Sequence, residues 1–468
     1  MEREVDVAII GAGSAGLTAW SQVRRRTDNW VLIDGGELGT TCARVGCMPS
    51  KALIQIAEDM ARREVLAKEG IEGGEALRVD RAAAMERVED LRDLFVDQVL
   101  ATSIDELSPE QFIESHARFV SPTELEVEGG RVRARRVIIA TGSRPLVPAP
   151  WQAFGDRVLT TDDFFELDGL PDRMAVIGLG VIGLELGQAL ARLGIEVTGF
   201  DLAGTIGGLT DPVVAAEAAE VIGKEFPLHL GRAAEVTEAG DGALRVSNGE
   251  VEVTVDKVLV AIGRTPNVES LGLENLGCAL DDRGIPLFDP HTLQVGDLPV
   301  FIAGDVTGTR PILHEANHEG RIAGYNACAE RPRRFARKTP FTIVFSDPNI
   351  VEVGASLAEL EGEDIVIGEG SFRPLGRALI MAKNKGRLRL YLRRRDGRLL
   401  GANVFAPKGE HLGHLLAWCI ERGSTLRELL QMPFYHPTLE EGLQSALNSL
   451  KAELDLGVDY PPELTPLD

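Results

Sequence analysis

Two copies of a strand, a glycine-rich turn and a helix constrain this chain more than any other feature. The apolar runs VDVAII and MAVI each lead into a G-x-G-x-x-G turn. The glycines are Gly11, Gly13 and Gly16 in the first copy, and Gly178, Gly180 and Gly183 in the second. Each copy continues to another apolar run that ends in an acid, Asp34 or Asp201, which stands 23 residues after the first glycine in both cases.

The spacing of these residues suits a dinucleotide. The first glycine permits a tight turn, the second lets the backbone approach a pyrophosphate, and the third lets the helix pack close to the strand. The helix N-terminus then offers free N–H groups to the phosphates, and the acid accepts from ribose hydroxyls. Continuous apolar runs at 137–141, 258–262 and 300–303 are typical of parallel strands buried on both faces. The sequence therefore predicts an α/β fold with two Rossmann-like dinucleotide-binding domains.

Composition narrows the class of protein. The 468 residues carry 49 Lys and Arg against 72 Asp and Glu, a formal charge of −23 that argues against a nucleic-acid partner. A hydrophobic content of 44% with 26% charged residues is ordinary for a globular protein. No apolar run approaches the ~18 residues of a membrane helix, and the first residues lack the basic and apolar regions of a signal peptide. We expect a cytoplasmic protein that does not bind membranes.

A pair of cysteines, Cys42 and Cys47, follows the first acid in the segment TTCARVGCMPSK. A helix is predicted over 51–70, which puts the pair at or just before its N-terminus, where thiolates are stabilised. A disulfide closing so short a loop gains little chain entropy and is easily reduced. Structural thiols or a zinc site are the alternatives, but no second Cys or His pair stands at zinc spacing nearby, so no metal site is predicted. A redox disulfide beside the first dinucleotide is favoured.

Two dinucleotide folds together with C-x4-C-x-P-S-K resemble the flavin-dependent pyridine nucleotide–disulfide oxidoreductases, along essentially the whole chain. Further matching segments are ATGSRP at 140–145, GRTPN at 263–267, AGD at 303–305, FSDP at 345–348 and HPTLEE at 436–441. Within the family the sequence is most similar to the dihydrolipoamide dehydrogenases. It departs from the family pattern at Asp34, where Glu is common, at Thr40, where Gly is usual, and at Asn349, where an acid is usual.

The resemblance implies FAD in the first site and a nicotinamide nucleotide in the second. The residues implied for FAD are Gly11, Gly13, Gly16, Asp34, Thr41, Lys51, Thr141, Gly142 and Asp305. Those implied for the second nucleotide are Gly178, Gly180, Gly183, Asp201 and Gly263. Asp201 would accept from a free ribose 2′-hydroxyl and repel a 2′-phosphate, and the segment 202–208 has no Arg or Lys to hold that phosphate. We therefore predict NAD rather than NADP.

The resemblance also implies roles in catalysis. Cys42 would exchange with the substrate, and Cys47 would lie against the flavin. His436 would be the base that generates thiolate, and Glu441 would orient its imidazole. Lys51 and Glu185 would meet between flavin and nicotinamide, where a buried charge needs a partner.

In the family this histidine reaches the disulfide of the partner subunit across a twofold interface, which implies a homodimer with two composite sites. Leucines recur at helical spacing near the C-terminus, as either a core-facing helix or a subunit interface: Leu439, Leu443, Leu447, Leu450 and Leu454.

The predicted organisation has four segments. An FAD-binding domain spans 1–150, an NAD-binding domain 151–267, a return to the FAD domain 268–338, and an α+β dimerisation domain 339–468. The predicted reaction is the FAD-dependent oxidation of dihydrolipoamide to lipoamide by NAD⁺, on a lipoyl-bearing carrier protein or multienzyme complex. A glutathione-reductase-like reduction of another disulfide by NAD(P)H, and a flavin transhydrogenase, are the alternatives.

Overall fold

The first glycine-rich turn follows strand β1, an inner strand of a seven-stranded sheet in the computed structural model, which describes residues 2–467. The sheet order is β3-β2-β1-β6-β5-β4, with β17 also pairing with β6. The strands around β1 are parallel, whereas β4, β5 and β6 form an antiparallel extension. The strands are β1 (Glu2–Ile10), β2 (Trp30–Asp34), β3 (Phe112–Glu114), β4 (Arg118–Ser121), β5 (Glu124–Val127), β6 (Gly130–Ile139) and β17 (Val300–Ile302).

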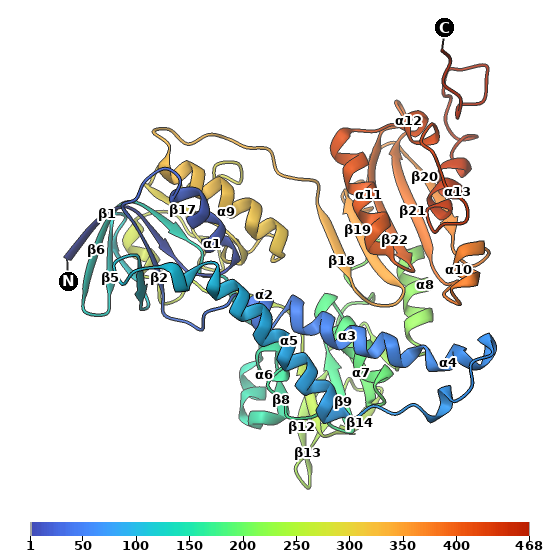
Figure 1. The fold of residues 1–468 in the computed structure, drawn as a ribbon, viewed down its shortest axis with the longest axis horizontal. Coiled ribbons are helices and arrows are strands. Elements are labelled where there is room, and N and C mark those ends of the chain that lie inside the picture. The colour runs from blue at the N-terminus through green and yellow to red at the C-terminus, as the bar shows by residue number, and fades with distance from the viewer. Residues whose placement is uncertain (1, 468) are drawn as a thin grey trace.

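The apolar run of β1 is buried on both faces, as its sequence predicts. Val7 and Ile9 face helices α1 (Ser14–Val23) and α9 (Leu313–Cys328), which lie side by side in Figure 1. Ala8 and Ile10 face the opposite way into a separate apolar cluster that contains Phe119, Leu125 and Val268. The sheet is thus covered on both sides, and the glycine turn emerges at the carboxyl end of β1.

The second unit repeats this order. Its main sheet is wholly parallel in the order β11-β10-β9-β15-β8, which matches β3-β2-β1-β6-β17 strand for strand. Its strands are β8 (Val158–Leu159), β9 (Arg173–Ile177), β10 (Glu196–Asp201), β11 (Leu228–Leu230) and β15 (Lys257–Val260), with an antiparallel sheet of β12 (Glu235–Gly240), β13 (Ala243–Ser247) and β14 (Glu252–Val255). Its helices are α6 (Thr161–Phe164), α7 (Val181–Arg192) and α8 (Pro212–Ile222).

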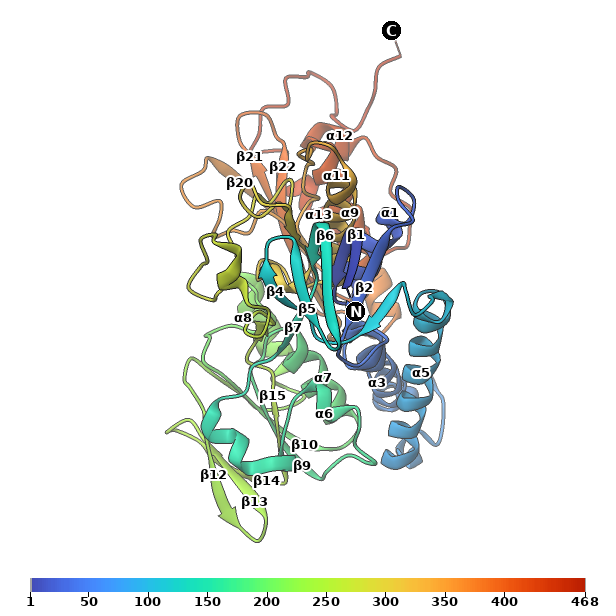
Figure 2. The same ribbon diagram turned by 90° about the vertical axis from the view of Figure 1, so that its left-hand side faces the viewer.

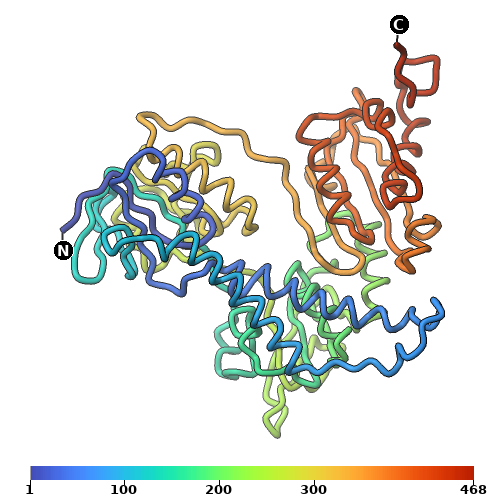
Figure 3. The backbone as a smooth tube through the Cα atoms, viewed as in Figure 1, coloured from blue at the N-terminus to red at the C-terminus, as the bar shows by residue number. Residues whose placement is uncertain are grey.

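The third unit is an antiparallel sheet in the order β18-β19-β22-β21-β20. A segment without regular secondary structure, 329–340, crosses to it from the end of α9 (Figure 3). The strands are β18 (Phe341–Val344), β19 (Asn349–Gly354), β20 (Ile365–Ser371), β21 (Arg387–Arg393) and β22 (Leu399–Ala406). The helices are α10 (Gly376–Ile380), α11 (Gly409–Arg422), α12 (Leu426–Leu430) and α13 (Glu441–Ser449).

The leucines near the C-terminus serve the core of this third unit. Leu443 and Leu447 on α13, and Leu450 and Leu454 after it, are buried with the apolar residues of the sheet and of α11. Leu439 is partly buried against the same cluster. Of the two interpretations of the leucine stripe, the core-facing helix is therefore the one that the structure supports.

Two helices of the first segment leave the first sheet and pack on the second unit. Helices α3 (Cys47–Ala61) and α5 (Arg81–Ala101) lie next to each other beside the second unit in Figures 1 and 2. Leu53 of α3 and Met85 of α5 share one apolar cluster with residues of α7 and α8. The helix expected over 51–70 instead starts at Cys47 and ends at Ala61, because the apolar stripe stops at Met60 and a charged exposed run follows. This packing brings the cysteine pair to the junction of the units.

The remaining elements are short. Strands β7 (Ser143–Pro145) and β16 (Arg264–Pro266) pair where the chain crosses between the first two units. Short helices are α2 (Thr41–Arg44), α4 (Arg63–Leu66), η1 (Ala67–Glu69), η2 (Gly74–Ala76), η3 (Ile104–Glu106), η4 (Ala149–Arg157), η5 (Leu273–Leu276) and η6 (Asp305–Thr307). Among residues 2–467, none of the helices combines the length and the apolar character needed to cross a membrane.

Candidate active site

The two glycine-rich turns have the same backbone geometry. Gly11 and Gly178 open them with φ of 106° and 92°, in the region that favours glycine. A Cβ on Gly11 would lie 2.3 Å from the carbonyl oxygen of Ala140, and one on Gly178 would lie 2.4 Å from that of Ala261. Each turn is therefore pressed against the neighbouring strand and requires glycine for steric reasons alone.

The third glycines hold each helix against its own turn. A Cβ on Gly16 or Gly183 would lie 1.8 Å from the carbonyl oxygen of the first glycine in the same copy. The middle glycines differ, because a Cβ on Gly13 or Gly180 would meet no atom within 4 Å. Space is therefore left open in front of the N-termini of α1 and α7, and within residues 2–467 no side chain caps either one. Both cradles fit a pyrophosphate.

The two acids are bound to these turns in the same way. Asp34 Oδ2 accepts from the backbone N–H of Ala12 at 2.5 Å, and Asp201 Oδ2 accepts from that of Leu179 at 2.5 Å. The second oxygen of each accepts from the N–H two residues further on, at 2.8 Å and 2.7 Å. Both carboxylates remain partly exposed at the strand ends, with lone pairs available to ribose hydroxyls.

The two cysteines lie on consecutive short helices. Cys42 is in α2 and Cys47 is the first residue of α3, and both are free, partly buried thiols. A hydrogen bond from Cys42, helped by the nearby charge of Lys51, outweighs burial and lowers the pKa of Cys47 to about 7. The same hydrogen bond, together with burial, raises the pKa of Cys42. The reduced pair therefore holds its thiolate on Cys47.

Lys51 and Glu185 join α3 to α7. Lys51 Nζ lies 2.7 Å from Glu185 Oε2, and the Glu185 side chain is only 3% exposed. The other oxygen, Oε1, accepts from the backbone N–H of Phe345 at 2.8 Å, and Lys51 Nζ lies 4.7 Å from the centre of the Phe345 ring. The sequence predicted the Lys51–Glu185 pair but not the contacts of Phe345 with both residues. Phe345 belongs to the third unit, and in the sequence only its place in the FSDP segment marks it.

The residues expected around the crossover also come together. Thr141 Oγ1 donates to the carbonyl of Asn267 at 2.8 Å, and Asn267 Nδ2 donates to the carbonyl of Thr141 at 2.9 Å. Asp305 Oδ2 accepts from Ser143 Oγ at 2.9 Å. Gly142 and Gly263 both have positive φ, 67° and 128°. Thr41, by contrast, is exposed at the start of α2 beside the cysteines.

His436 and Glu441 form a pair that is separate from the thiols of the same chain. His436 Nδ1 lies 2.8 Å from Glu441 Oε1, and the backbone N–H of Thr438 donates to Oε2 at 3.0 Å. The hydrogen bond with His436 lowers the pKa of Glu441. The His436 side chain is 78% exposed. It precedes α13, which Figure 1 shows well away from α2, and within residues 2–467 the side-chain hydrogen bond and ion pair of His436 are both with Glu441.

Comparison with known families decides the classification. A family model described as pyridine nucleotide-disulphide oxidoreductase matches residues 5–320, and the dimerisation domain of the same family matches 340–447. The chain belongs to this family. It is an oxidoreductase whose family uses FAD and NAD(H), and it carries the family's dimerisation domain.

Curated relatives match over nearly their full length. The chain is 32% identical to the dihydrolipoyl dehydrogenase of Haloferax volcanii over 466 residues, covering 94% of this chain and 95% of the relative. It is 30% identical to that of Geobacillus stearothermophilus, covering 97% of each.

Solved structures share the fold. LpdA from Mycobacterium tuberculosis superposes with a TM-score of 0.82 at 25% identity, covering 95% of this chain and all of that one. The HOCl-induced flavoprotein disulfide reductase RclA from Escherichia coli superposes with a TM-score of 0.82 at 23% identity, with the same coverage.

Proposed function

We propose that this protein is a dihydrolipoyl dehydrogenase, which oxidises dihydrolipoamide with NAD⁺ through FAD. One observation carries the proposal: a hydrogen-bonded pair, Cys42 and Cys47, adjoins the Lys51–Glu185 ion pair between two dinucleotide cradles. The curated relatives with that activity match almost the whole chain.

The two cradles take different cofactors in this scheme. The first would hold FAD through its glycine turn and Asp34, with Thr41, Lys51, Thr141, Gly142 and Asp305 toward the flavin. The second would hold NAD through its own turn and Asp201, with Gly263 at its edge. When bound, FAD and NAD together supply the hydride chemistry that a polypeptide lacks. The flavin domain would then comprise 1–150 and 268–338, the NAD domain 151–267 and the dimerisation domain 339–468.

The protein's own chemistry takes place at sulfur. In the oxidised enzyme Cys42 and Cys47 form a disulfide. A substrate thiolate attacks Cys42 Sγ, and Cys47 leaves as thiolate, which its lowered pKa favours. The second substrate thiol then displaces Cys42, so that the substrate leaves as a cyclic disulfide and both cysteines are reduced. Lys51 stabilises the Cys47 thiolate by its charge while Glu185 holds its ammonium group in place.

His436 would take the proton from the substrate thiol. Its exposure, and the separation of the following helix α13 from α2 in Figure 1, favour a homodimer in which each His436 would serve the cysteines of the partner. Glu441 would hold the ring by its hydrogen bond to Nδ1, which directs Nε2 toward the thiol. A lipoyl-bearing carrier protein or multienzyme complex would present the substrate.

Asp201 supports NAD over NADP. Both of its oxygens face backbone N–H groups and no cation follows within 202–208, so a 2′-phosphate would meet negative charge without a counter-ion. A glutathione-type reductase that uses NADPH would require a cation near the ribose to bind the 2′-phosphate. A flavin transhydrogenase would require neither the thiol pair nor His436.

An assay of NADH formation from dihydrolipoamide tests the proposal. The wild type should turn over, whereas Cys42→Ser and His436→Gln should lose nearly all dithiol activity. Cys419→Ser and His414→Gln are matched controls in the third unit and should retain it. Equal turnover in all five proteins would refute the dithiol mechanism, and reduction of NADP⁺ but not of NAD⁺ would refute the nucleotide assignment.

A further inference from the structure

The loop that leads away from Asp201 is held on the third unit. This loop, 202–210, has no helix or strand and joins the end of β10 to the start of α8. Its first half is largely exposed, with Leu202 71% accessible. In its second half Ile206 and Leu209 are buried, because they share an apolar cluster with Val344 and Ile350 of the third unit.

The middle of the loop touches both the glycine turn and the third unit. The backbone N–H of Gly207 donates to the carbonyl of Leu179 at 2.8 Å, and Leu179 is the residue whose N–H binds Asp201. A Cβ on Gly207 would lie 2.8 Å from Ile350 Cδ1. Through Gly207 the loop therefore connects the glycine turn that binds Asp201 to the sheet of the third unit.

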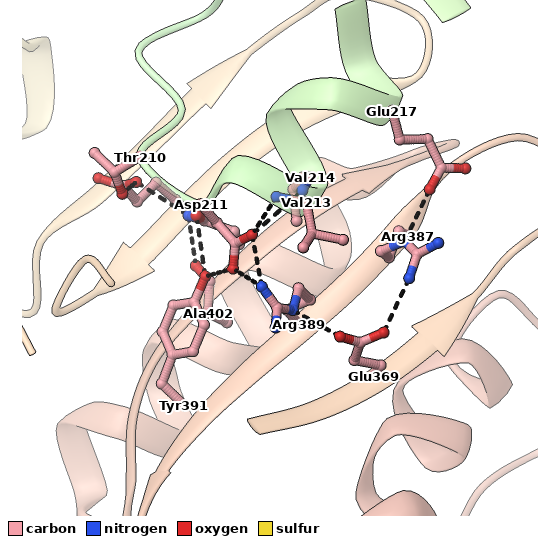
Figure 4. Close-up of polar contacts among 12 residues, drawn as sticks. Thr210, Asp211, Val213, Val214, Glu217, Glu369, Arg387, Arg389, Tyr391 and Ala402 are labelled. Carbon is pink, nitrogen blue, oxygen red and sulfur yellow. Dashed lines mark hydrogen bonds and ion pairs between the residues drawn. The ribbon is translucent and has the colours of Figure 1, made fainter. Parts of the chain in front are cut away.

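The end of the loop is fixed by a buried acid. Asp211 is fully inaccessible, and its Oδ1 accepts from the N–H groups of Val213 and Val214 at the start of α8. Arg389 Nη1 lies 2.7 Å and 2.6 Å from its two oxygens, and Tyr391 OH donates to Oδ2 at 2.7 Å (Figure 4). Burial alone raises the pKa of Asp211, but the hydrogen bonds from Tyr391 and Arg389 outweigh it and the pKa lies below its ordinary value.

Strand β21, which supplies Arg389 and Tyr391, alternates polar and apolar side chains. In β21, RLRLYLR, the residues Arg387, Arg389 and Tyr391 point toward α8 while the intervening leucines enter the core of the third unit. Arg387 binds Glu217, farther along α8, at 2.9 Å. The strand therefore makes two ionic contacts with one helix, and only the contact through Asp211 adjoins the loop.

We infer that Arg389 and Tyr391 are positioning residues for the nicotinamide nucleotide: by clamping Asp211 they fix the loop 202–210, and through Gly207 and Leu179 they fix Asp201 at the ribose. This inference rests on the assignment of Asp201 to the nucleotide. It makes the dimerisation domain part of the nucleotide site, although none of its side chains need touch the nucleotide.

The test compares Tyr391→Phe and Arg389→Lys with Arg387→Gln in the FAD-loaded protein. Removing Arg389 outright would strand a buried carboxylate, so the two conservative variants are used. Each should raise the KM for NAD⁺, and the dissociation constant from equilibrium dialysis, by about three- to tenfold with kcat nearly unchanged. Hydrogen exchange at Gly207 should also accelerate. Arg387→Gln weakens the contact with the same helix at a point away from the loop. It should leave the KM for NAD⁺, the dissociation constant and hydrogen exchange at Gly207 unchanged.

The outcomes separate this inference from the proposed function. Unchanged nucleotide affinity in Tyr391→Phe and Arg389→Lys would overturn it, as would an equal effect in Arg387→Gln. If the wild type binds NADP(H) instead, the proposed cofactor is wrong, and the same comparison made with NADP(H) still decides whether the clamp positions the nucleotide.

Discussion

The two dinucleotide units are alike up to the acid and differ after it. Both have the same strand order, the same glycine contacts and the same pair of backbone bonds to the acid. After Asp34 the chain runs into α2 and the cysteines, whereas after Asp201 it runs into a loop clamped on the third unit. The first cradle is thus followed by the cysteine pair, and the second by a loop that is anchored on the third unit.

Under the proposed function, this difference indicates where the specific chemistry of each unit would reside. The shared part binds any dinucleotide, because it offers only a helix N-terminus and an acid. Under the proposed function, the segment that follows the acid would decide whether the unit exchanges electrons with sulfur or binds a nucleotide that dissociates after each turnover. Substitutions in the shared part and in each extension test that division.

Removing either thiol should have the largest effect. Cys42→Ser or Cys47→Ser should lower dihydrolipoamide oxidation by at least about 10³-fold, because no other group in the site forms the disulfide. Reduction of an artificial dye by NADH, which needs the two cradles but not the thiols, should persist. Parallel loss of both activities would show that the cysteines are required for the fold or for cofactor binding instead.

Substitutions at the middle glycines, Gly13 and Gly180, should affect the two cradles independently. An alanine at Gly13 or Gly180 enters open space in the protein but would meet a pyrophosphate. We expect Gly13→Ala to weaken FAD retention, and Gly180→Ala to weaken NAD⁺ binding, each by about a hundredfold. Thermal unfolding of the FAD-free protein should be unaffected. Gly169→Ala, also in open space but outside the cradles, is the control.

The Lys51–Glu185 pair should show strong coupling. Lys51→Met leaves a buried carboxylate uncompensated, so the single variant should be less stable than the double variant Lys51→Met/Glu185→Gln by about 2 kcal/mol. Urea unfolding of the wild type, Lys51→Met, Glu185→Gln and the double variant measures this difference. Additive losses would mean that the ion pair contributes little.

The thiolate should titrate near neutrality. Alkylation of the reduced protein should rise with pH around a midpoint of about 7, the lowered pKa of Cys47. Because folding lowers this pKa, the thiolate stabilises the reduced protein above the pKa of the unfolded thiol, and this stability is lost as the pH falls through about 7. In Lys51→Met/Glu185→Gln the midpoint should move upward, because Lys51 lowers this pKa more than Glu185 raises it. A midpoint that stays in place would exclude the proposed role of Lys51.

The smallest effect is expected at Thr40. This residue has φ of 66° and ψ of 144°, a region almost confined to glycine, and its Oγ1 accepts from the N–H of Ala43 at 3.3 Å. Thr40→Ala keeps the strain and loses the cap, and should cost about 1 kcal/mol. Thr40→Gly relieves the strain as it loses the cap, so the free energy of unfolding should change by less than ~1 kcal/mol. Equal loss in both variants would mean that the backbone is unstrained.

The sequence predicts what depends on local spacing. The glycine turns, the acids and the His436–Glu441 pair can be located because each belongs to a motif. The Lys51–Glu185 pair joins residues 134 positions apart, and only the family resemblance predicted it. The clamp on Asp211 could not, since Arg389 lies 178 residues away and alternating basic residues in a strand indicate only a polar face. The bond from the Phe345 N–H to Glu185 could not be predicted either, because every residue except proline carries a backbone N–H.

The departure from the family pattern at Asn349 has a local explanation in the structure. At Asn349 the amide donates to the carbonyl of Ser346 at 2.6 Å and accepts from the N–H of Glu410 at 3.3 Å. An ionised acid could make only the second of these bonds. The sequence alone shows that Asn349 is unusual at this position, but not which neighbouring groups form hydrogen bonds with it.

The outward position of His436 has a genetic consequence. If each imidazole works on the other subunit, two inactive variants can rescue one another: a mixed dimer of Cys42→Ser and His436→Gln would contain one intact centre and one doubly damaged centre. Random reassortment of equal amounts would then restore about a quarter of the normal rate, since half of the dimers are mixed and half of their centres work. Two alleles that fail alone would complement in the same cell.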